Sequence, residues 1–290
     1  MGEERALIIP TCCAWSPTGR TRGASRRGEE QPSMPELSTA YYAQYIEAAR
    51  SHWWFRGRER VVQSVARPLV QHLRMLVVDV GSGPGGPARA VFPDARIVAM
   101  DVSLMPLRAN TSADERVVGD AARVPCRTGS LAALCAFDVL EHLEDDMGAL
   151  REWHRVLRPG GWLVLTVPAY QALWSAHDDL NGHRRRYRRR ALQRLLSDTG
   201  FLVRRLTYFS TILLPAVALV RWTQRLLKSR RPQEVSSSGL GELDFQQRFP
   251  RWLERCFEGA FQLEAMWLRR HTLPAGVSIC AVVQARPCAE

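Results

Sequence analysis

Lysine is almost absent from this sequence, and its absence changes how the charge is interpreted. Lys228 is the only lysine, although lysine and arginine together number 40 and the formal net charge is +11. Arginine therefore carries nearly all of the positive charge, a skew typical of codon bias rather than of a dedicated nucleic-acid surface. Bulk charge consequently predicts no nucleic-acid partner, and only local clusters of arginine carry weight.

Paired cysteines and long apolar runs are also lacking. The seven cysteines include no C-x-x-C pair and no metal-ligand spacing, which favours reduced, mostly buried thiols in a cytoplasmic protein. The most apolar stretch, residues 206–220, is too short to cross a bilayer comfortably. It is either a buried strand followed by a helix, or an interfacial segment whose basic flank at 221–231 contacts anionic lipid.

The beginning of the chain offers little to a folded core. Residues 1–35 are rich in glycine, serine, arginine and glutamate without periodicity, so their burial cannot offset the entropy of ordering. We predict a disordered extension there, and the residues from Met34 onward resemble an ordinary start of translation. The remaining residues, 36–290, are predicted to form a single domain in which 206–270 are a helical cap or insertion.

Residues 41–73 have the apolar spacing of a helix, with Ser51 as its N-cap and Pro68 as a break. Trp53 and Trp54 fall near its start. These aromatic side chains either complete the core or form a lid over a ligand pocket, and the two interpretations are compatible.

A glycine-rich turn is the feature around which the rest is organised. The run VVDVGSGPGG, residues 77–86, reads as a strand that stops at glycine. Glycines at 81, 83, 85 and 86 allow positive φ and leave main-chain N–H groups open to a ligand. A helix at 88–92 would point its N-terminus at the same place. The pattern predicts a nucleotide-type site.

Two cofactors fit this turn. Gly81, Gly83 and Gly86 satisfy the G-x-G-x-x-G pattern of dinucleotide-binding proteins, with Asp101 about twenty residues further on. Asp79 extends the pattern to D-x-G-x-G-x-G, and an acid at that position suits a ligand with an ammonium group and a sulfonium cation. Asp79 therefore favours a sulfonium cofactor over a nicotinamide dinucleotide.

Strands and helices alternate beyond the turn. We predict strands at 75–80, 96–100, 116–118, 131–137 and 162–167, with helices at 104–110 and 144–156 between them. This order implies an α/β protein with a doubly wound, mostly parallel sheet and right-handed crossovers. Such sheets bind ligands at the carboxyl ends of their strands, where Asp79, Asp101, Asp120 and Asp138 fall.

Four segments of the chain now resemble one family. VVDVGSGPGG, GDAARVPC, DVLEHL and LRPGGWLVLTVP occur in the order and spacing of the class I S-adenosylmethionine-dependent methyltransferases, over about residues 77–168. SHWWFRGRER and the stretch 173–201 resemble an uncharacterised bacterial subgroup with the type 11 or type 23 methyltransferase domain. The resemblance implies a Rossmann-like fold with an α-helical N-terminal lid and a helical insertion before the last strand.

The resemblance also implies the cofactor and its site. S-adenosylmethionine would be held by nine residues, namely Asp79, Val80, Gly81, Gly83, Asp101, Val102, Asp120, Ala121 and Phe137. An acid such as Asp101 can accept hydrogen bonds from vicinal ribose hydroxyls, and Asp120 can accept one from the adenine amino group. A turn or helix cap remains the structural alternative for Asp120.

Three histidines are candidate catalytic residues. If the acceptor is a hydroxyl or phenol, a base with a pKa near neutral helps, and His142, His177 and His183 are available. Glu141 and Asp178 are candidate partners. A hydrogen-bonded cap at a helix start is an equally good interpretation of His142.

Other interpretations of the same region stay open. Asp138, Glu141 and His142 resemble the acid-x-x-Glu-His arrangement that is implicated in metal binding by quinone-biosynthesis O-methyltransferases, although our prediction includes no metal. The six arginines between 184 and 190 either bind a phosphate or carboxylate of the substrate, or form a solvated helix face.

We predict an enzyme that methylates a small-molecule or lipid-linked acceptor, with O-methylation of an apolar or membrane-borne hydroxyl favoured. Peripheral contact with an anionic membrane follows from the apolar stretch at 206–220. No nucleic-acid partner is expected, because no N-P-P-Y-type motif and no catalytic Pro-Cys pair occurs in the right place. The alternatives are an NAD-dependent oxidoreductase and a non-catalytic methyltransferase-like binding module.

Overall fold

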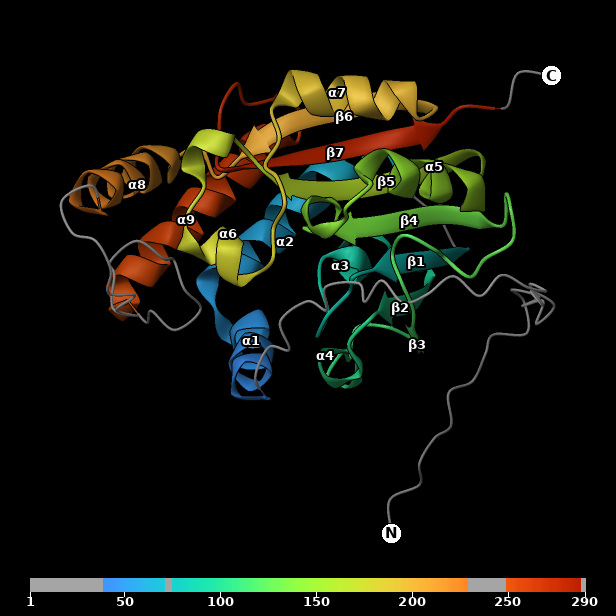
Figure 1. Ribbon diagram of the computed structural model, residues 1–290, viewed down its shortest axis with the longest axis horizontal. Coiled ribbons are helices and arrows are strands. Elements are labelled where there is room, and N and C mark those ends of the chain that lie inside the picture. The colour runs from blue at the N-terminus through green and yellow to red at the C-terminus, as the bar shows by residue number, and fades with distance from the viewer. Residues whose placement is uncertain (1–38, 71–74, 229–248, 288–290) are drawn as a thin grey trace, which may run out of the picture.

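The computed structural model of the protein describes residues 39–70, 75–228 and 249–287. It is built from one central sheet with helices on both faces (Figure 1). The predicted extension at 1–35 lies outside the described residues.

The sheet has seven strands in the order β3-β2-β1-β4-β5-β7-β6. The strands are β1 Leu76–Val80, β2 Arg96–Asp101, β3 Glu115–Val118, β4 Leu131–Phe137, β5 Leu157–Pro168, β6 Phe201–Phe209 and β7 Ser278–Ala285. β7 pairs antiparallel with both β5 and β6, whereas the pairings among β1 to β5 are all parallel. The predicted α/β class, with its mostly parallel sheet, is confirmed.

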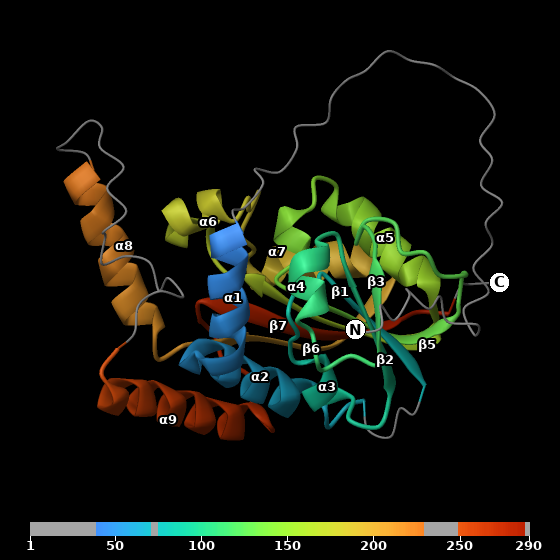
Figure 2. The same cartoon turned by 90° about the horizontal axis from the view of Figure 1, so that it is seen from below.

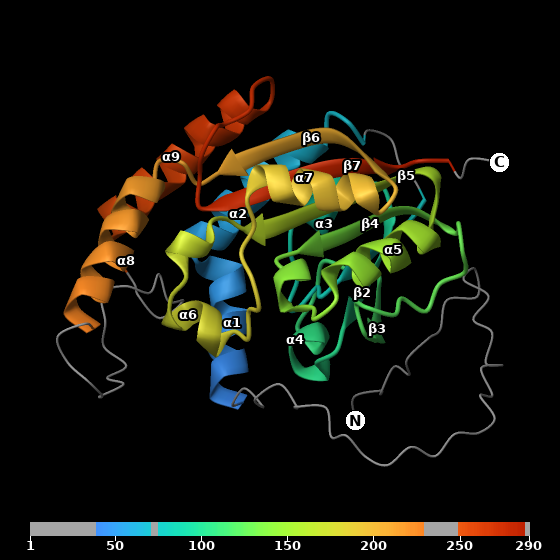
Figure 3. The same ribbon diagram turned by 45° about the horizontal axis from the view of Figure 1, so that its top comes forward.

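Two groups of helices cover the sheet. The α-helices are α1 Thr39–Ser51, α2 Trp53–Ala66, α3 Ala88–Val91, α4 Leu104–Arg108, α5 Asp146–Val156, α6 Ala176–Leu180, α7 Arg189–Asp198, α8 Leu214–Lys228 and α9 Arg251–Leu268, with short 3₁₀ turns η1 Leu140–His142 and η2 Gln171–Leu173. α5 and α7 lie on one face, and α2, α3 and α9 lie on the other (Figures 2 and 3).

The central strand β4 shows why the sheet is buried on both sides. All seven of its side chains are buried. Leu134 and Ala136 belong to the core formed with α5 and α7, whereas Ala133 and Cys135 belong to the core formed with α2 and α9. A near-continuous apolar run is what a parallel strand covered on both faces requires.

The aromatic start of α2 divides its roles between core and cavity. Trp53 is fully buried and packs on Phe257 of α9, with ring centroids 4.5 Å apart. Gly57 permits this contact between the helices, because a Cβ there would lie 2.4 Å from the ring of Phe261. Trp54 and Phe55 instead line the cavity described below.

The predicted helix at 41–73 is two helices, and the prediction of Ser51 as an N-cap is wrong. Ser51 closes α1, where its hydroxyl donates to the carbonyl of Glu47 at 3.0 Å. His52, which has extended backbone angles, caps α2 by accepting the N–H of Trp54 at 3.3 Å. The extended residue turns the chain between the helices. α2 ends at Ala66, just before Pro68, as predicted.

Two further elements differ from their predicted bounds. β5 begins at Leu157 rather than at residue 162, because Gly160 takes a positive φ of 76° and the pairing with β4 shifts register there. Residues 206–209 belong to β6 and pair with β7, so the predicted helical segment at 206–270 begins only at Leu214. The interpretation of residues 206–220 as a buried strand followed by a helix is thereby confirmed.

The carboxyl ends of the parallel strands point toward α1 and α6 (Figure 1). Three non-glycine residues with positive φ lie at this edge: Asp138 after β4, Tyr170 after β5 and Ser210 after β6. Such backbone costs about 1–2 kcal/mol per residue and concentrates at functional sites. Among the helices in the described part of the chain, none is long and apolar enough to cross a membrane.

Candidate active site

A cavity of about 460 Å³ opens at the carboxyl edge of the sheet. Its walls come from the ends of β1 to β5, from α1 and α2, from residues 177–186 and from α8. Of the twelve predicted site residues, ten line it: Gly81, Gly83, Asp101, Val102, Asp120, Ala121, Phe137, His142, His177 and His183. The remaining two, Asp79 and Val80, are buried in β1 directly beneath the glycine turn.

The glycine turn needs glycine for backbone and for packing. Gly81 and Gly83 have φ of 61° and 50°, which side-chain-bearing residues rarely adopt. A Cβ on Gly81 would lie 2.5 Å from Val139, and one on Gly83 would lie 3.1 Å from the hydroxyl of Tyr45. Tyr45 on α1 therefore covers the turn. No sequence motif marked Tyr45, because this contact depends on how α1 packs.

Asp101 is fixed against the turn. Its two carboxylate oxygens accept the N–H groups of Gly83 and Ser103, each at 2.8 Å. Burial raises the pKa of Asp101, and these backbone hydrogen bonds oppose the rise. A carboxylate offers about four acceptor positions, so these backbone hydrogen bonds leave room for a hydroxyl group of a ribose.

Asp79 lies just below the turn in a different environment. It is only 2% exposed, and among the described residues its Oδ1 has no hydrogen-bond partner. Burial raises the pKa of Asp79 to about 8; Arg58 opposes the rise and Asp101 adds to it. An unpartnered buried acid beneath the turn suits a ligand that brings positive charge or donors.

The remaining cofactor candidates frame the cavity. Val102 and Asp120 are exposed at its mouth, while Ala121 and Phe137 are buried in its wall. Asp120 accepts the N–H of Ala122 at 2.8 Å, so the turn role expected as an alternative is present, and one carboxylate oxygen remains for a ligand. A nucleoside-bearing cofactor such as S-adenosylmethionine fits this combination of acids, apolar wall and open backbone.

Asp138 follows β4 and links the sheet to α2. Its Oδ1 accepts the hydroxyl of Thr166 at 2.9 Å, and its Oδ2 accepts the guanidinium of Arg58. Arg58 is 7% exposed, and it lies 4.9 Å from the ring centroid of Trp54. Asp138 is thus engaged by an internal ion pair, which removes it from the acid-x-x-Glu-His set considered in the sequence.

Glu141 and His142 lie on η1, at the floor of the same cavity. Glu141 is completely buried, and its pKa is raised well above the usual range by burial and then by Asp138. Burial and the neighbouring His183 lower the pKa of His142 to about 4, so this imidazole is neutral at pH 7.

The segment after β5 brings His183 to His142. The N–H of Arg184 donates to the carbonyl of Glu141 at 2.8 Å, which lays the segment across η1. The rings of His142 and His183 meet edge to face with centroids 4.7 Å apart. Residues 41 positions apart in the sequence therefore share one site, and nothing in the spacing predicted this contact.

Asp178 holds His183 in place. Its Oδ1 accepts His183 Nδ1 at 2.8 Å, and Arg186 donates to both carboxylate oxygens, at 2.8 and 2.9 Å. Burial opposes ionisation of Asp178, but the hydrogen bonds from His183 and Arg186 outweigh it and hold the pKa of Asp178 below its usual range. Asp178 was expected as a histidine partner, and it pairs with His183 rather than with His177.

His177 lines the cavity on the far side of His183, with ring centroids 6.3 Å apart. Burial and then His183 lower the pKa of His177 to about 4.

The arginines between 184 and 190 were expected either to bind a phosphate or carboxylate of the substrate or to form a solvated helix face, and neither expectation holds for all of them. Arg186 is committed to Asp178, and Arg185 donates to the carbonyls of Leu143 and Glu144 at 3.1 and 2.6 Å. These two side chains brace the site from within.

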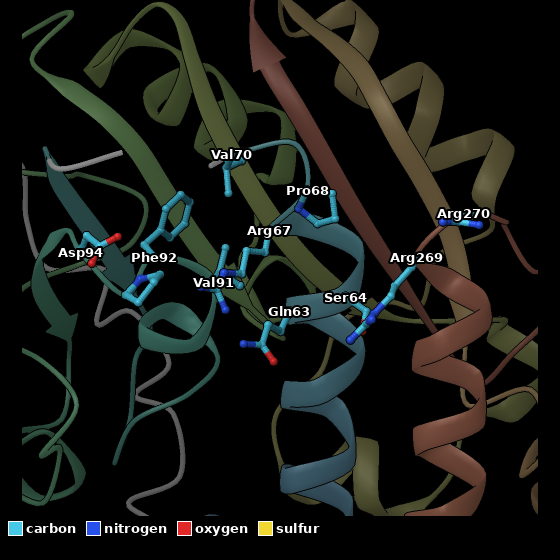
Figure 4. A pocket seen from close by; sticks show the side chains of 11 residues that line it. Gln63, Ser64, Arg67, Pro68, Val70, Val91, Phe92, Asp94, Arg269 and Arg270 are labelled. Atoms are coloured by element: carbon cyan, nitrogen blue, oxygen red, sulfur yellow. The ribbon is translucent and has the colours of Figure 1, made fainter. Parts of the chain in front are cut away.

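A second hollow has a volume of about 620 Å³ (Figure 4). It is bounded by the end of α2, the residues around Phe92 and the end of α9. It brings together no group of acids and histidines comparable to that of the cavity.

Comparisons with known proteins agree with this geometry. Residues 78–165 match a family model described as "Methyltransferase domain". An uncharacterized 37.1 kDa protein in transposon TN4556 of Streptomyces fradiae is 31% identical over 208 residues, 63% of this chain and 58% of that protein. A protein of Mycolicibacterium smegmatis named as a probable S-adenosylmethionine-dependent methyltransferase is 30% identical over 161 residues, 53% of this chain and 62% of its own.

The match thus spans about three fifths of the length of these two relatives. Among solved structures, a complex between the Haloferax volcanii Trm112 methyltransferase activator and a methyltransferase aligns with a TM-score of 0.52. The alignment covers 86% of this chain and 99% of that one at 17% identity, so it shows a similar fold and nothing about function.

The comparisons favour a sulfonium cofactor over the nicotinamide cofactor that the glycine pattern alone allowed. The order of motifs, the sheet topology and the named relatives agree with one another. Residues 78–165 therefore carry a methyltransferase domain, and the comparisons support a class I fold with S-adenosylmethionine as the cofactor.

Proposed function

We propose that this protein transfers a methyl group from S-adenosylmethionine to a hydroxyl of a small-molecule or lipid-linked acceptor. One observation carries the proposal: the glycine turn with Asp101 and the histidine group with Glu141 line the same cavity. A cofactor at the turn and an acceptor at the histidines would then lie side by side, which is the arrangement that direct transfer requires.

The cofactor half of the proposal assigns the nine residues predicted from the sequence to S-adenosylmethionine. Asp101 receives the ribose hydroxyls, the main chain at Gly81 and Gly83 approaches the amino-acid portion, and Asp79 lies below it. Val102, Asp120 and Ala121 contact the adenine, while Val80 and Phe137 support the wall. When bound, S-adenosylmethionine would supply an electrophilic methyl group to the acceptor oxygen, with its sulfur as the leaving group.

The acceptor half assigns the hydroxyl proton to His183. Asp178 accepts His183 Nδ1–H, which leaves Nε2 free of a proton to accept one from the acceptor. The neutral His142 and His177 beside it are secondary candidates for the same role. A positioned base of this kind accelerates proton transfer by about 10²- to 10⁴-fold.

The test is transfer of labelled methyl groups. We would incubate the full chain with methyl-labelled S-adenosylmethionine and, separately, lipid and aqueous extracts of Streptomyces fradiae, the source of one relative. We expect label in a product that resists alkali, as an ether does and a carboxyl ester does not. His183→Asn should lower the rate at least about 100-fold, whereas the surface substitution His271→Asn should not change it.

Label in an alkali-labile ester would remove O-methylation of a hydroxyl, and no transfer to either extract would favour a binding module without turnover. Loss of S-adenosylhomocysteine binding by His183→Asn would show a folding defect instead, so binding is measured on every variant.

We further propose that the protein is cytoplasmic, that its acceptor is apolar, and that it reaches this acceptor at the inner face of an anionic membrane. Trp54 and Phe55 give the cavity an aromatic wall. Ile212, just before α8, and Leu219 and Trp222 within it are 55%, 58% and 60% exposed. Arg221, the first residue of the predicted basic flank, lies buried in the cavity wall and does not serve that surface.

Flotation with liposomes tests this surface. The full chain should float with vesicles that contain anionic phospholipid and less with neutral ones, because apolar and electrostatic contacts add. The double substitution Leu219→Ser and Trp222→Ser should reduce flotation several-fold. Leu202→Ser, which alters an exposed leucine on the edge strand β6, is the matched control and should have no effect. Equal flotation of both variants would remove α8 from the proposal.

A further inference from the structure

Three side chains from two segments of the chain converge at the floor of the cavity. One ligand atom each from Glu141, His142 and His183 lies within 4.8 Å of the other two. Glu141 is completely buried, and within the described residues neither of its carboxylate oxygens has a hydrogen-bond partner. A buried carboxyl left without partners costs free energy in either protonation state, so the site calls for a group that engages it.

The two histidines present nitrogen atoms to the same point. The rings are nearly perpendicular, at 84°, and Nδ1 of His142 is buried without a partner in the described chain. His183 donates its own Nδ1–H to Asp178, which directs the opposite nitrogen, Nε2, away from that carboxylate. Arg186 grips both oxygens of Asp178 and fixes the pair.

The pair of His183 and Asp178 has the geometry of a metal-binding histidine oriented by a carboxylate. A histidine that binds a metal through one ring nitrogen usually donates the other N–H to a carboxylate, which sets the tautomer and the ring orientation. His183 with Asp178 has this form. Asp138 is excluded from the set, because Arg58 and Thr166 already occupy its oxygens.

We propose that Glu141, His142 and His183 bind a divalent transition-metal cation, for which Zn²⁺ and Co²⁺ are suitable probes. Two imidazoles and one carboxylate are a donor set typical of such cations and poorly suited to Mg²⁺ or Ca²⁺, which prefer oxygen. Ligand atoms of a tetrahedral site lie about 3.4 Å apart, so modest side-chain rotations close the cluster. Three protein ligands leave a coordination position open toward the cavity.

The catalytic consequence rests on the proposed function, but the binding does not. A hydroxyl at the open position would have a lowered pKa and would lose its proton to water, since a bound divalent cation stabilises the oxyanion. In the cation-loaded protein His183 is therefore a ligand, and the cation takes over the activation that His183 performs in the cation-free protein. The sequence prediction of a metal-free site would then be wrong.

Cation binding is measured without cofactor or acceptor. Full-length protein stripped with a chelator is titrated with Co²⁺, whose visible absorption reports nitrogen and oxygen coordination, and with Zn²⁺ by calorimetry. We expect one equivalent of either cation per chain and no heat with Mg²⁺. Glu141→Gln and His183→Asn should each weaken Zn²⁺ binding more than 100-fold, and Asp178→Asn, which removes outer support, about 10- to 100-fold.

His271→Asn is the matched control, because it makes the same chemical change at an exposed histidine after α9 and should leave the stoichiometry and affinity unchanged. Binding of S-adenosylhomocysteine by each variant shows that it is folded. The proposal is overturned if the stripped protein binds neither cation, or if Glu141→Gln and His183→Asn bind as the wild type does.

The two proposals fail separately. Methyl transfer that persists in chelator, with no Co²⁺ bands, would keep the proposed function, leave His183 as its base and overturn the cation site. Stoichiometric Co²⁺ binding that requires Glu141 and His183, in a protein that methylates neither extract, would keep the cation site and overturn the function.

Discussion

The two halves of the cavity are built by different means. The cofactor half consists of backbone and of acids that lie at or near the ends of neighbouring strands. The turn at Gly81 and Gly83 comes from residues close together in sequence, and Asp101 ends the neighbouring strand β2. The acceptor half consists of side chains from distant segments, such as His142 on η1 and His183 across it. The cofactor half is formed mainly by residues that are close together in the sequence, whereas the acceptor half is brought together by tertiary contacts.

This contrast teaches where specificity resides. A turn of glycines fixed by an acid can hold the same cofactor in many proteins, because it depends on few side chains. A pocket assembled from α1, α2, η1 and the segment after β5 can change its acceptor through any of them. We therefore expect substitutions in one half to affect cofactor binding and fold stability, and substitutions in the other to affect turnover.

The largest effect is expected at Asp79, where the cofactor half keeps a buried acid. Its pKa of about 8 lies above the usual 3.8, so the protonated form is favoured in the folded state. The unfolded chain ionises first as pH rises, and stability falls between about pH 4 and pH 8. Asp79→Asn removes this loss, and above pH 8 the cofactor-free variant should be the more stable by on the order of 3 kcal/mol.

Denaturant unfolding of the wild type and Asp79→Asn at pH 5 and pH 8.5 measures this difference. The exposed acid Asp94 gives a matched control, Asp94→Asn, which makes the same chemical change at the surface. A difference between Asp79→Asn and the wild type that stays constant over this range would show that Asp79 is ionised in the folded protein.

The next effect is expected at Asp101. Asp101→Ala removes the carboxylate that fixes the N–H groups of Gly83 and Ser103 and that would receive the ribose. Hydrogen bonds to charged groups contribute about 1.5–3 kcal/mol, so S-adenosylhomocysteine should bind about 100-fold more weakly by calorimetry. Asp94→Ala is the control. Unchanged affinity in Asp101→Ala would place the cofactor elsewhere.

The smallest effect is expected at Arg58, which joins the two halves through Asp138. Arg58→Met leaves the Asp138 side chain, 24% exposed, without its ion-pair partner. Because partial exposure reduces the cost of an unpaired charge, we expect a loss of about 2 kcal/mol in stability. Arg56, also on α2, forms an ion pair with Glu258 of α9, and the two side chains are 43% and 26% exposed. Arg56→Met breaks this more exposed pair and should cost less than about 1 kcal/mol.

Thermal unfolding of the two arginine variants side by side measures this contrast. A loss of about 2 kcal/mol corresponds to a lower Tm by roughly 4–8 °C in a domain of this size. Equal losses for both variants would show that the link between the halves is no more stabilising than a surface ion pair.

Much of the cofactor half could be predicted from the sequence, since the information is local. A run of β-branched residues that ends in glycine defined β1, and β4 was predicted with the bounds it has in the structure. The positions of Asp101 and Asp120 followed from the rule that ligands bind at the carboxyl ends of strands.

The rest depends on tertiary contacts that no spacing encodes. Tyr45 reaches Gly83 only because α1 turns back at His52. Asp178 forms its hydrogen bond with His183 rather than with His177 because the chain bends at Gly182, where φ is 67°. Asp138 was grouped with Glu141 and His142 as a possible metal-binding set because they are neighbours in sequence, but its carboxylate forms an ion pair with Arg58 of α2.

The central claim is that the cofactor half forms an S-adenosylmethionine site that does not depend on the acceptor half. Isothermal titration of the wild type and of His183→Asn with S-adenosylhomocysteine, and of the wild type with NAD, tests it most directly. We predict micromolar affinity for S-adenosylhomocysteine that agrees within about twofold between the two proteins, and no heat with NAD. Binding of NAD, or no binding of S-adenosylhomocysteine by the wild type, would contradict the account.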